Sequence, residues 1–132
     1  MRFDWLQYLH LAKELATQGM TEEHQEAKLR TAIHLAYYVA FNLAKSYLRD
    51  RPAIAIPKTS DVHSYVSDQF ELHPDPDQKS VGRKLKRLRK FRNQADYATF
   101  FPGLPNFTTA SITLAEEIIS ILCNFSRGEI GD

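Results

Sequence analysis

The sequence has few of the features that would form disulfides, bind phosphate through a glycine-rich loop or span a membrane. One cysteine, Cys123, excludes an intrachain disulfide. Five glycines are present, and they form no glycine-rich phosphate loop. The most apolar stretch, residues 32–44, is shorter than a bilayer requires and contains His34 and Asn42. We therefore expect no membrane role and, because the N-terminus lacks the apolar core of a secretion signal, a cytoplasmic protein.

The sequence offers no set of ligands for a metal ion or a cofactor. Cys123 lies on the apolar face of the last expected helix, where a lone thiol usually behaves as an inert core residue. The histidines show no pairing with cysteine or carboxylate at metal-ligand spacing on one helix, so we predict no metal site and no cofactor. The five histidines are His10, His24, His34, His63 and His73.

Helical periodicity runs through most of the chain, and no convincing strand or repeat interrupts it. Apolar residues recur at helical spacing between prolines and capping residues, and the short links favour antiparallel neighbours. With 132 residues, 43% of them hydrophobic, the chain can close one core. We predict a single domain over residues 1–132, an all-α, up-and-down bundle of four to five antiparallel helices. The helices are expected at residues 4–18, 21–50, 62–70, 78–97 and 108–127, with caps at Asp4, Thr21, residues 59–61, residues 74–77, and Thr108 or Thr109.

No acidic residue lies between Lys79 and Arg92, although eight of the 17 basic residues do. The rest of the chain holds nine basic and 16 acidic residues, a net charge of −7, so a nearly neutral sequence is strongly polarised. A positive stripe on an acidic body favours a polyanion such as RNA, DNA or a nucleotide, and a solvated helix face is the alternative. The basic residues expected to face solvent are Arg83, Lys86, Arg87 and Lys90.

One arginine of the basic stretch falls on the apolar side of its helix. Arg92 shares that side with apolar residues at positions 81, 85, 88 and 95. An unpaired buried guanidinium is expensive, so Arg92 must meet a carboxylate, a hydrogen-bonding cavity or a ligand phosphate. Asp96 is one turn further on, Arg89 lies nearly one turn before, and Asn93 is just beyond. Arg92 and Asp96 therefore form either an ion pair that ends the helix, contributing about 0.3–0.5 kcal/mol if exposed, or part of a functional site.

The long second helix carries further candidates. Arg30 and His34 are one turn apart, on the side that also carries Tyr37 and Tyr38. Two interpretations stay open, because a sequence gives no distance between helices. Either these residues line the same cleft as Arg92, or His34 is a core histidine satisfied by a carbonyl or a tyrosine hydroxyl.

Two motifs resemble the HEPN family (higher eukaryotes and prokaryotes nucleotide-binding). Residues 37–41 read Tyr-Tyr-Val-Ala-Phe, similar to a Tyr-Tyr-Ala-x-Phe stretch in the family's long second helix. Residues 92–97 read Arg-Asn-Gln-Ala-Asp-Tyr, similar to a subgroup with Arg-x-x-Ala-Asp-Tyr in place of the common Arg-Asn-x-x-x-His. The pattern Trp5-x-x-Tyr8-Leu9-x-x-Ala12 and the pair His63-Ser64 are also similar. The likeness covers most of the chain in helix order.

The resemblance implies a bundle that is usually a homodimer, with the arginine motifs of two subunits facing each other across a cleft. It also implies a nucleotidyltransferase partner protein, as in toxin-antitoxin pairs. Members with the full motif cleave RNA without a metal, the 2′-hydroxyl attacking the adjacent phosphate. Arg92 matches the family arginine and Asn93 the polar residue after it, whereas Tyr97 stands where the histidine would be. A phenol titrates near ~10, so Tyr97 is a poor proton shuttle at neutral pH.

Three functions follow as hypotheses. The first is a dimeric module that binds RNA or a nucleotide through Arg89, Arg92, Asn93 and the basic residues of the same helix. The second is a ribonuclease in which Arg92 acts with Asp96, Tyr97 or His63, the last supplied by the short third helix. The third is a purely structural dimerisation module. The surroundings of Arg92 distinguish them: burial against Asp96 without a cavity favours the third.

Overall fold

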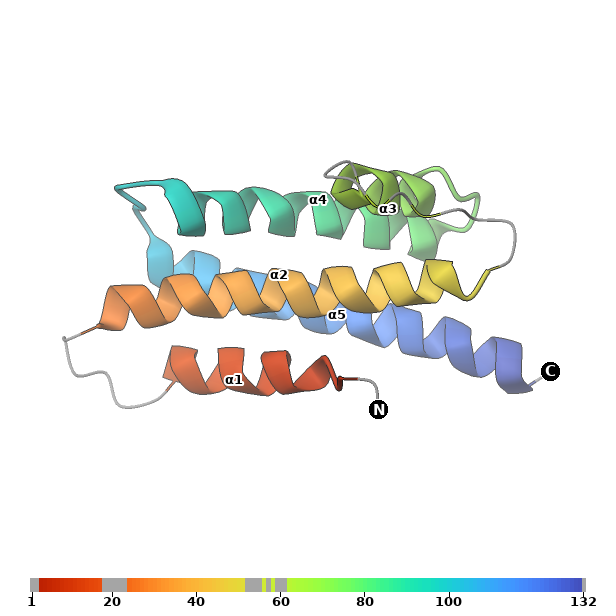
Figure 1. Cartoon of the computed structure of the whole chain (residues 1–132), viewed down its shortest axis with the longest axis horizontal. Coiled ribbons are helices and arrows are strands. Elements are labelled where there is room, and N and C mark those ends of the chain that lie inside the picture. Colours follow the sequence, from red (N-terminus) through yellow and green to blue (C-terminus); the bar gives the residue numbers. More distant parts are fainter. Residues whose placement is uncertain (1–2, 18–23, 52–55, 57, 59–61, 132) are drawn as a thin grey trace.

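The computed structural model describes residues 3–17, 24–51, 56, 58 and 62–131, with the backbone alone for residues 127–131. This part of the chain contains helices and no strand. Figure 1 shows the helices, which are α1 (Leu6–Thr17), α2 (Gln25–Arg49), α3 (Val62–Glu71), α4 (Pro76–Tyr97) and α5 (Leu104–Gly131). The all-α, up-and-down prediction is confirmed, because α1, α2, α4 and α5 alternate in direction along the chain.

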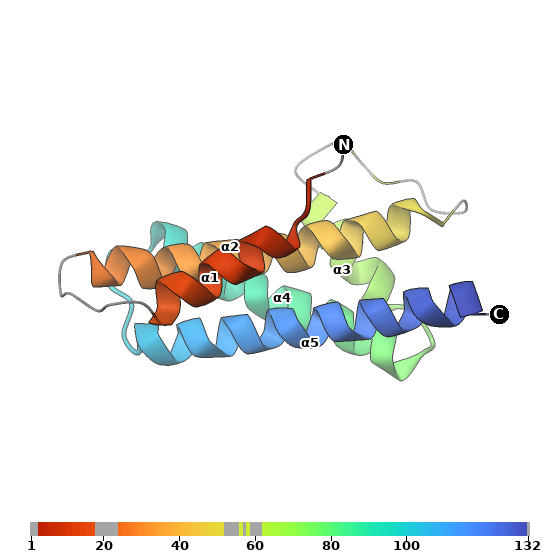
Figure 2. The ribbon, with the colours of Figure 1, turned by 90° about the horizontal axis from the view of Figure 1, so that it is seen from below.

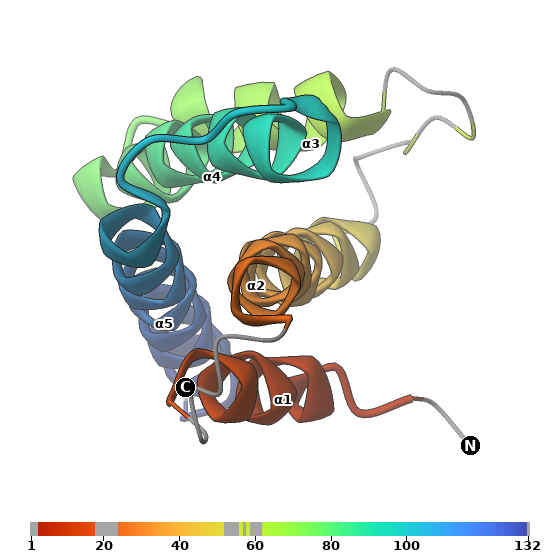
Figure 3. The same cartoon turned by 90° about the vertical axis from the view of Figure 1, so that its left-hand side faces the viewer.

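The second helix occupies the middle of the bundle, as its sequence predicts. Figure 3 shows α2 between α1 on one side and α4 on the other, with α5 alongside and α3 lying against α4. Seen from below in Figure 2, α1 covers α2 and α5. A helix that is apolar around its whole circumference requires neighbours on most sides. Twelve α2 residues are buried accordingly, among them Ile33, Tyr37 and Val39.

The last two helices both begin earlier than predicted, and a capping residue explains the first of these starts. Asp75 caps α4, its carboxylate accepting from the backbone amides of Asp77 and Gln78 at 3.0 Å, so α4 begins at Pro76, two residues before the predicted start at residue 78. The last helix begins at Leu104, after a turn at Gly103 with φ 74°. Proline is compatible with the first turn of a helix, so Pro105 does not delay this start.

The two threonines predicted to cap the last helix lie inside it instead. Thr108 donates to the carbonyl of Leu104 at 2.9 Å, and Thr109 donates to that of Pro105 at 3.2 Å. Both hydroxyls thus bond back four residues along an existing helix.

Two more helix ends differ from the prediction: α2 begins at Gln25, not at residue 21, and α5 runs to Gly131, not to residue 127. Asp4 accepts from the amide of Leu6 at 3.0 Å, as a cap should. The second helix is preceded by His24, which has a left-handed φ of 67°. The expected caps at Thr21 and residues 59–61 lie outside the described residues.

Cys123 is exposed rather than in the core, so its prediction was wrong. The buried side of α5 is formed by Ala115, Ile118 and Leu122. Each helical residue turns about 100° from the one before, which carries Cys123 from that side to the edge. Among the described residues no helix is both long and apolar enough to cross a membrane.

Gly82 sets the spacing of α3 against α4. It is buried, and a Cβ placed on it would lie 2.6 Å from the backbone nitrogen of Glu71 and 2.6 Å from the carbonyl oxygen of Ser67. The two helices are therefore in backbone contact at this point, which any larger residue would separate.

Candidate functional site

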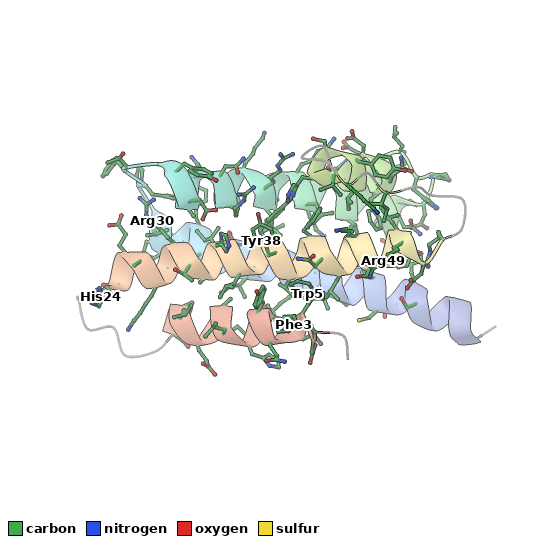
Figure 4. The ribbon with its side chains drawn as sticks, viewed as in Figure 1. Phe3, Trp5, His24, Arg30, Tyr38 and Arg49 are labelled. Atoms are coloured by element: carbon green, nitrogen blue, oxygen red, sulfur yellow. The ribbon has the colours of Figure 1, made fainter. Side chains whose placement is uncertain are left out.

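Arg92 is buried on the apolar side of α4, where the sequence placed it. The residue is 8% exposed, and its apolar neighbours Val81, Leu85, Leu88 and Ala95 are buried with it. Its guanidinium carbon lies 5.3 Å from the ring centroid of Tyr37 and 5.5 Å from that of Tyr38, both on α2. Figure 4 shows Tyr38 rising from α2 toward α4. Two aromatic faces thus hold the cation between the helices.

The ion pair between Arg92 and Asp96 does not account for this burial. One hydrogen bond joins Nη1 to the carboxylate, at 3.4 Å, and the Nε atom is buried without a hydrogen-bond partner among the described residues. A guanidinium has five donors, so most of them remain available. Burying a charge costs several kcal/mol, whereas a loose pair returns at most about 1 kcal/mol. Arg92 is therefore a buried cation with spare donors.

Asp96 has a second partner on α2. Nδ1 of His34 lies 3.1 Å from one carboxylate oxygen and 3.0 Å from the other. An ionised carboxylate only accepts hydrogen bonds, so Nδ1 of His34 is the donor in this contact. The side chain of His34 is 43% exposed, so it is not the core histidine of one interpretation. Arg92, Asp96 and His34 form one chain of contacts across α2 and α4.

His63, at the start of α3, meets the same cluster from the third helix. The hydroxyl of Tyr37 lies 2.5 Å from Nδ1 of His63. Burial raises the pKa of Tyr37, so its hydroxyl keeps its proton and donates. Burial lowers the pKa of His63 to about 4, helped by the positive charges of Arg89, Arg92 and Lys45. The ring is therefore neutral at pH 7 with its proton on Nε2.

Arg89 lies one turn before Arg92, at the wall of a groove. Its Nη1 donates to the hydroxyl of Ser64 at 3.1 Å, and its Nε, like that of Arg92, is buried without a partner in the described part of the chain. The groove between α3 and α4 has a volume of about 400 Å³. Its lining consists of Ser64, Ser67, Asp68, Lys86, Arg89, Lys90 and Asn93.

The basic residues expected to face solvent do not all keep a free charge. Lys86 is exposed but pairs with Asp68 at 2.8 Å and with Glu71, and these contacts raise its pKa. Its charge is therefore neutralised locally, which corrects its place in the solvent-facing set. The rest of the set, Arg83, Arg87 and Lys90, is exposed, and no ion pair joins any of the three to a described residue.

Arg30 supports the end of α4 instead of lining a cleft with Arg92. Its Nη1 donates to the carbonyls of Ala95 at 3.0 Å and Ala98 at 2.6 Å, and its Nη2 to that of Thr99 at 3.4 Å. Figure 4 shows Arg30 reaching from α2 toward this end of α4. Arg30 thus satisfies terminal carbonyls that a helix leaves unpaired.

Tyr97 stands apart from the cluster. It is 78% exposed, and no hydrogen bond to a described residue involves its hydroxyl. The cluster instead contains two contacts that the sequence did not indicate: Tyr37 with His63, and Ser64 with Arg89. Tyr37 was already expected on the same side of its helix as His34, but its partner His63 lies on another helix.

No group of three or more His, Cys, Asp or Glu side chains able to hold a metal ion occurs within the residues that the structure describes. The side chains that the site brings together are guanidinium donors, two imidazoles and one shared carboxylate. Such a set can bind a phosphate and accept a proton.

The comparisons with known proteins agree with this architecture. No curated protein and no solved structure matches the chain. A family model described as HEPN domain matches residues 7–126, which include all of α2, α3 and α4. The helical bundle is the fold of that family, and its members point to a function related to nucleotides or RNA. The chain belongs to the HEPN domain family.

Proposed function

We propose that this protein binds RNA or a nucleotide through phosphate contacts at Arg89 and Arg92. One observation carries the proposal: both arginines have a buried Nε without a hydrogen-bond partner among the described residues. Buried polar groups are almost always satisfied, so two adjacent orphan donors point to a missing acceptor. Phosphate oxygens suit guanidinium donors well, because the two form charge-assisted, often bidentate, hydrogen bonds.

The charge around these donors supports an anionic ligand. Lys90 and Asn93 line the groove beside Arg89. Burial lowers the pKa of His63 to about 4, and the charges of Arg89, Arg92 and Lys45 lower it further, so the field of these cations reaches the start of α3. A phosphate entering this field would be attracted to it and would partly neutralise it.

We further propose a homodimer, in which the two Arg92 sites face each other, and a nucleotidyltransferase partner in a toxin-antitoxin pair. The support is the arrangement that the family resemblance implies. A dimer would double the positive charge along one RNA backbone. Sedimentation at micromolar concentration tests the dimer, and a monomer at every concentration would contradict it.

The test of binding uses fluorescence anisotropy with a labelled single-stranded RNA and with a labelled adenine nucleotide. We expect affinity to fall steeply as salt rises and Arg92→Gln to weaken binding about tenfold. Arg87→Gln removes the same charge from an exposed site on α4 and should change affinity less than threefold. Far-UV circular dichroism confirms that both variants fold. Affinity that ignores salt, or equal losses in the two variants, would contradict the proposal.

A second function, metal-independent RNA cleavage, is favoured by the contact between His34 and Asp96. Nε2 of His34 would take the proton of a 2′-hydroxyl, whose oxygen attacks the adjacent phosphorus. The bond to the 5′-oxygen breaks, that oxygen takes a proton from water, and Arg92 stabilises the charge on the phosphorus. The products would be a 2′,3′-cyclic phosphate and a 5′-hydroxyl. His63, neutral at pH 7, is not the acid at that pH.

Cleavage is tested separately from binding, by mass spectrometry of RNA incubated with the protein and EDTA. We expect cyclic phosphate ends from the wild-type protein and none from His34→Gln, which keeps a hydrogen bond to Asp96 but cannot take up the proton. Cyclic ends that persist in His34→Gln would remove this histidine from the reaction. If the protein dimerises but binds neither RNA nor nucleotide, the structural module is the function.

A further inference from the structure

The groove between α3 and α4 has one neutral end and one positive end. At the neutral end, Lys86 is paired with Asp68 and Glu71. At the other end, Arg89 and Lys90 line the groove, and neither pairs with a carboxylate of the described residues. An anionic chain in the groove is therefore held at the end nearer the C-terminus of α4.

At the neutral end, α3 and α4 are in close contact. Gly82 touches the backbone of α3 at Ser67 and Glu71, and a second hollow beyond Lys86 is lined by Glu71, Leu72 and Arg83. Figure 1 shows that α3 lies over the first half of α4 and leaves the second half uncovered. From the positive end of the groove, an anionic chain can continue along this uncovered second half of α4.

That direction leads to an exposed aromatic ring. Lys90, Asn93 and Tyr97 are spaced three and four residues apart on α4, so they lie on one helix face. Lys90 and Asn93 line the groove, and Tyr97 is the next residue of the same face, 78% exposed. At 1.5 Å per residue the face from Lys90 to Tyr97 is about 10 Å long, enough for a short stretch of unpaired nucleotides.

We infer that the lane formed by Lys90, Asn93 and Tyr97 binds an unpaired stretch of RNA, with a phosphate at Arg89 and Lys90 and a base stacked on Tyr97. The inference rests on the proposed function and adds to it the form of RNA that binds. Base stacking on exposed aromatic rings contributes a large part of single-strand affinity. A duplex hides the faces of its bases, so it can contact the cations but not the ring.

The role of Tyr97 in this inference differs from proton transfer. Tyr97 occupies the position of the family's motif histidine. Among the described residues no hydrogen bond joins its hydroxyl to His34 or Asp96. Its ring, not its hydroxyl, is the part presented to a ligand. Phenylalanine should therefore replace it without loss.

The experiment measures affinity for three RNA probes with the full chain: a single-stranded oligomer, the same oligomer annealed to its complement, and an abasic chain with the same number of phosphates. We expect the single strand to bind at least fivefold more tightly than the other two. Tyr97→Ala should lower single-strand affinity at least fivefold and leave abasic-chain affinity unchanged. Tyr97→Phe should bind as the wild-type protein does.

The matched control is Leu72→Ala. Leu72 is 77% exposed, as Tyr97 is 78% exposed, but it lies beyond the neutral end of the groove, next to Glu71 and Arg83. Its removal should leave all three affinities within twofold. Both residues are exposed, so both variants should fold, which circular dichroism checks.

The two levels of the proposal fail in different ways. A wild-type protein that binds no RNA probe overturns the binding function itself. A wild-type protein that binds all three probes equally, with Tyr97→Ala no weaker than Leu72→Ala, leaves the binding function standing and overturns the lane.

Discussion

In the first half of α4 two lysines are matched by carboxylates from other helices, whereas no cation of the second half is matched in this way by a described residue. Lys84 pairs with Glu117 of α5 at 3.0 Å, and Lys86 pairs with Asp68 of α3 at 2.8 Å. In the second half, Arg89 donates to a serine, and Arg92 has a loose contact with Asp96 at 3.4 Å. The difference teaches that the density of positive charge in a sequence is not the charge available to a ligand. Neighbouring helices decide which part of the charge is used.

The largest effect is expected at the end of the second half, where Arg30 holds α4 in place. Arg30→Ala removes hydrogen bonds to the carbonyls of Ala95, Ala98 and Thr99. A hydrogen bond to a charged group contributes about 1.5–3 kcal/mol. We therefore expect the free energy of unfolding, measured by urea denaturation, to fall by about 2–3 kcal/mol. Arg49→Ala, an exposed arginine on the same helix, should change it by less than about 0.5 kcal/mol. Equal, small losses in both variants would show that the end of α4 does not depend on Arg30 for its stability.

In the first half, Gly82→Ala tests whether contact with α3 shapes the groove. Overpacking costs typically 1–3 kcal/mol, and alanine regains up to about 1 kcal/mol of helix propensity. We expect the free energy of unfolding to fall by about 1–2 kcal/mol, because the added Cβ meets backbone atoms at 2.6 Å. Ser80→Ala gains propensity without that clash and should not destabilise the protein. A Gly82→Ala variant more stable than Ser80→Ala would contradict the close approach of the two helices.

A smaller effect should be visible in the pH dependence of His63, which reports the unmatched charge of the second half. The pKa of His63 is about 4 in the folded protein against 6.5 in a free chain. As pH falls below 6.5 the unfolded chain takes up the proton first, so stability should decrease between pH 6.5 and about 4 and then level off. His63→Gln should remove this component of the decrease.

The pKa of His63 also distinguishes the basic residues near it from those further away. In an NMR titration Arg89→Ala should raise the pKa of His63, since Arg89 is one of the charges that lower it. Arg87→Ala should leave it unchanged. An identical response to both variants would mean that burial alone sets the pKa.

Much of the fold could be predicted from the sequence, because helical periodicity and capping residues are local signals. The buried position of Arg92 followed from its place among apolar residues of one helix face. The start of α5 was missed because Pro102, Gly103 and Pro105 indicated a longer interruption than the chain makes. Cys123 was missed because it lies at the edge of an apolar face, where a small error in the face's centre changes burial.

The contacts of the site were less accessible, because they join residues far apart in the chain. His34 meets Asp96 only through the register of α2 against α4, and nothing in either segment fixes that register. Lys86 loses its free charge to carboxylates of α3 for the same kind of reason. Arg30, one turn before His34, bonds to carbonyls instead of joining Arg92, and backbone acceptors leave no trace in a sequence.

The most direct test of the central claim is the salt dependence of single-stranded RNA affinity in wild-type protein, Arg89→Ala and Arg87→Ala. Each phosphate contact contributes roughly 0.7 to the slope of log affinity against log salt for a single strand. Because Arg89 lines the groove and Arg87 does not, Arg89→Ala should lower the slope by about that amount and weaken binding, while Arg87→Ala keeps the wild-type slope. Equal slopes in all three proteins, or the larger loss in Arg87→Ala, would contradict the claim.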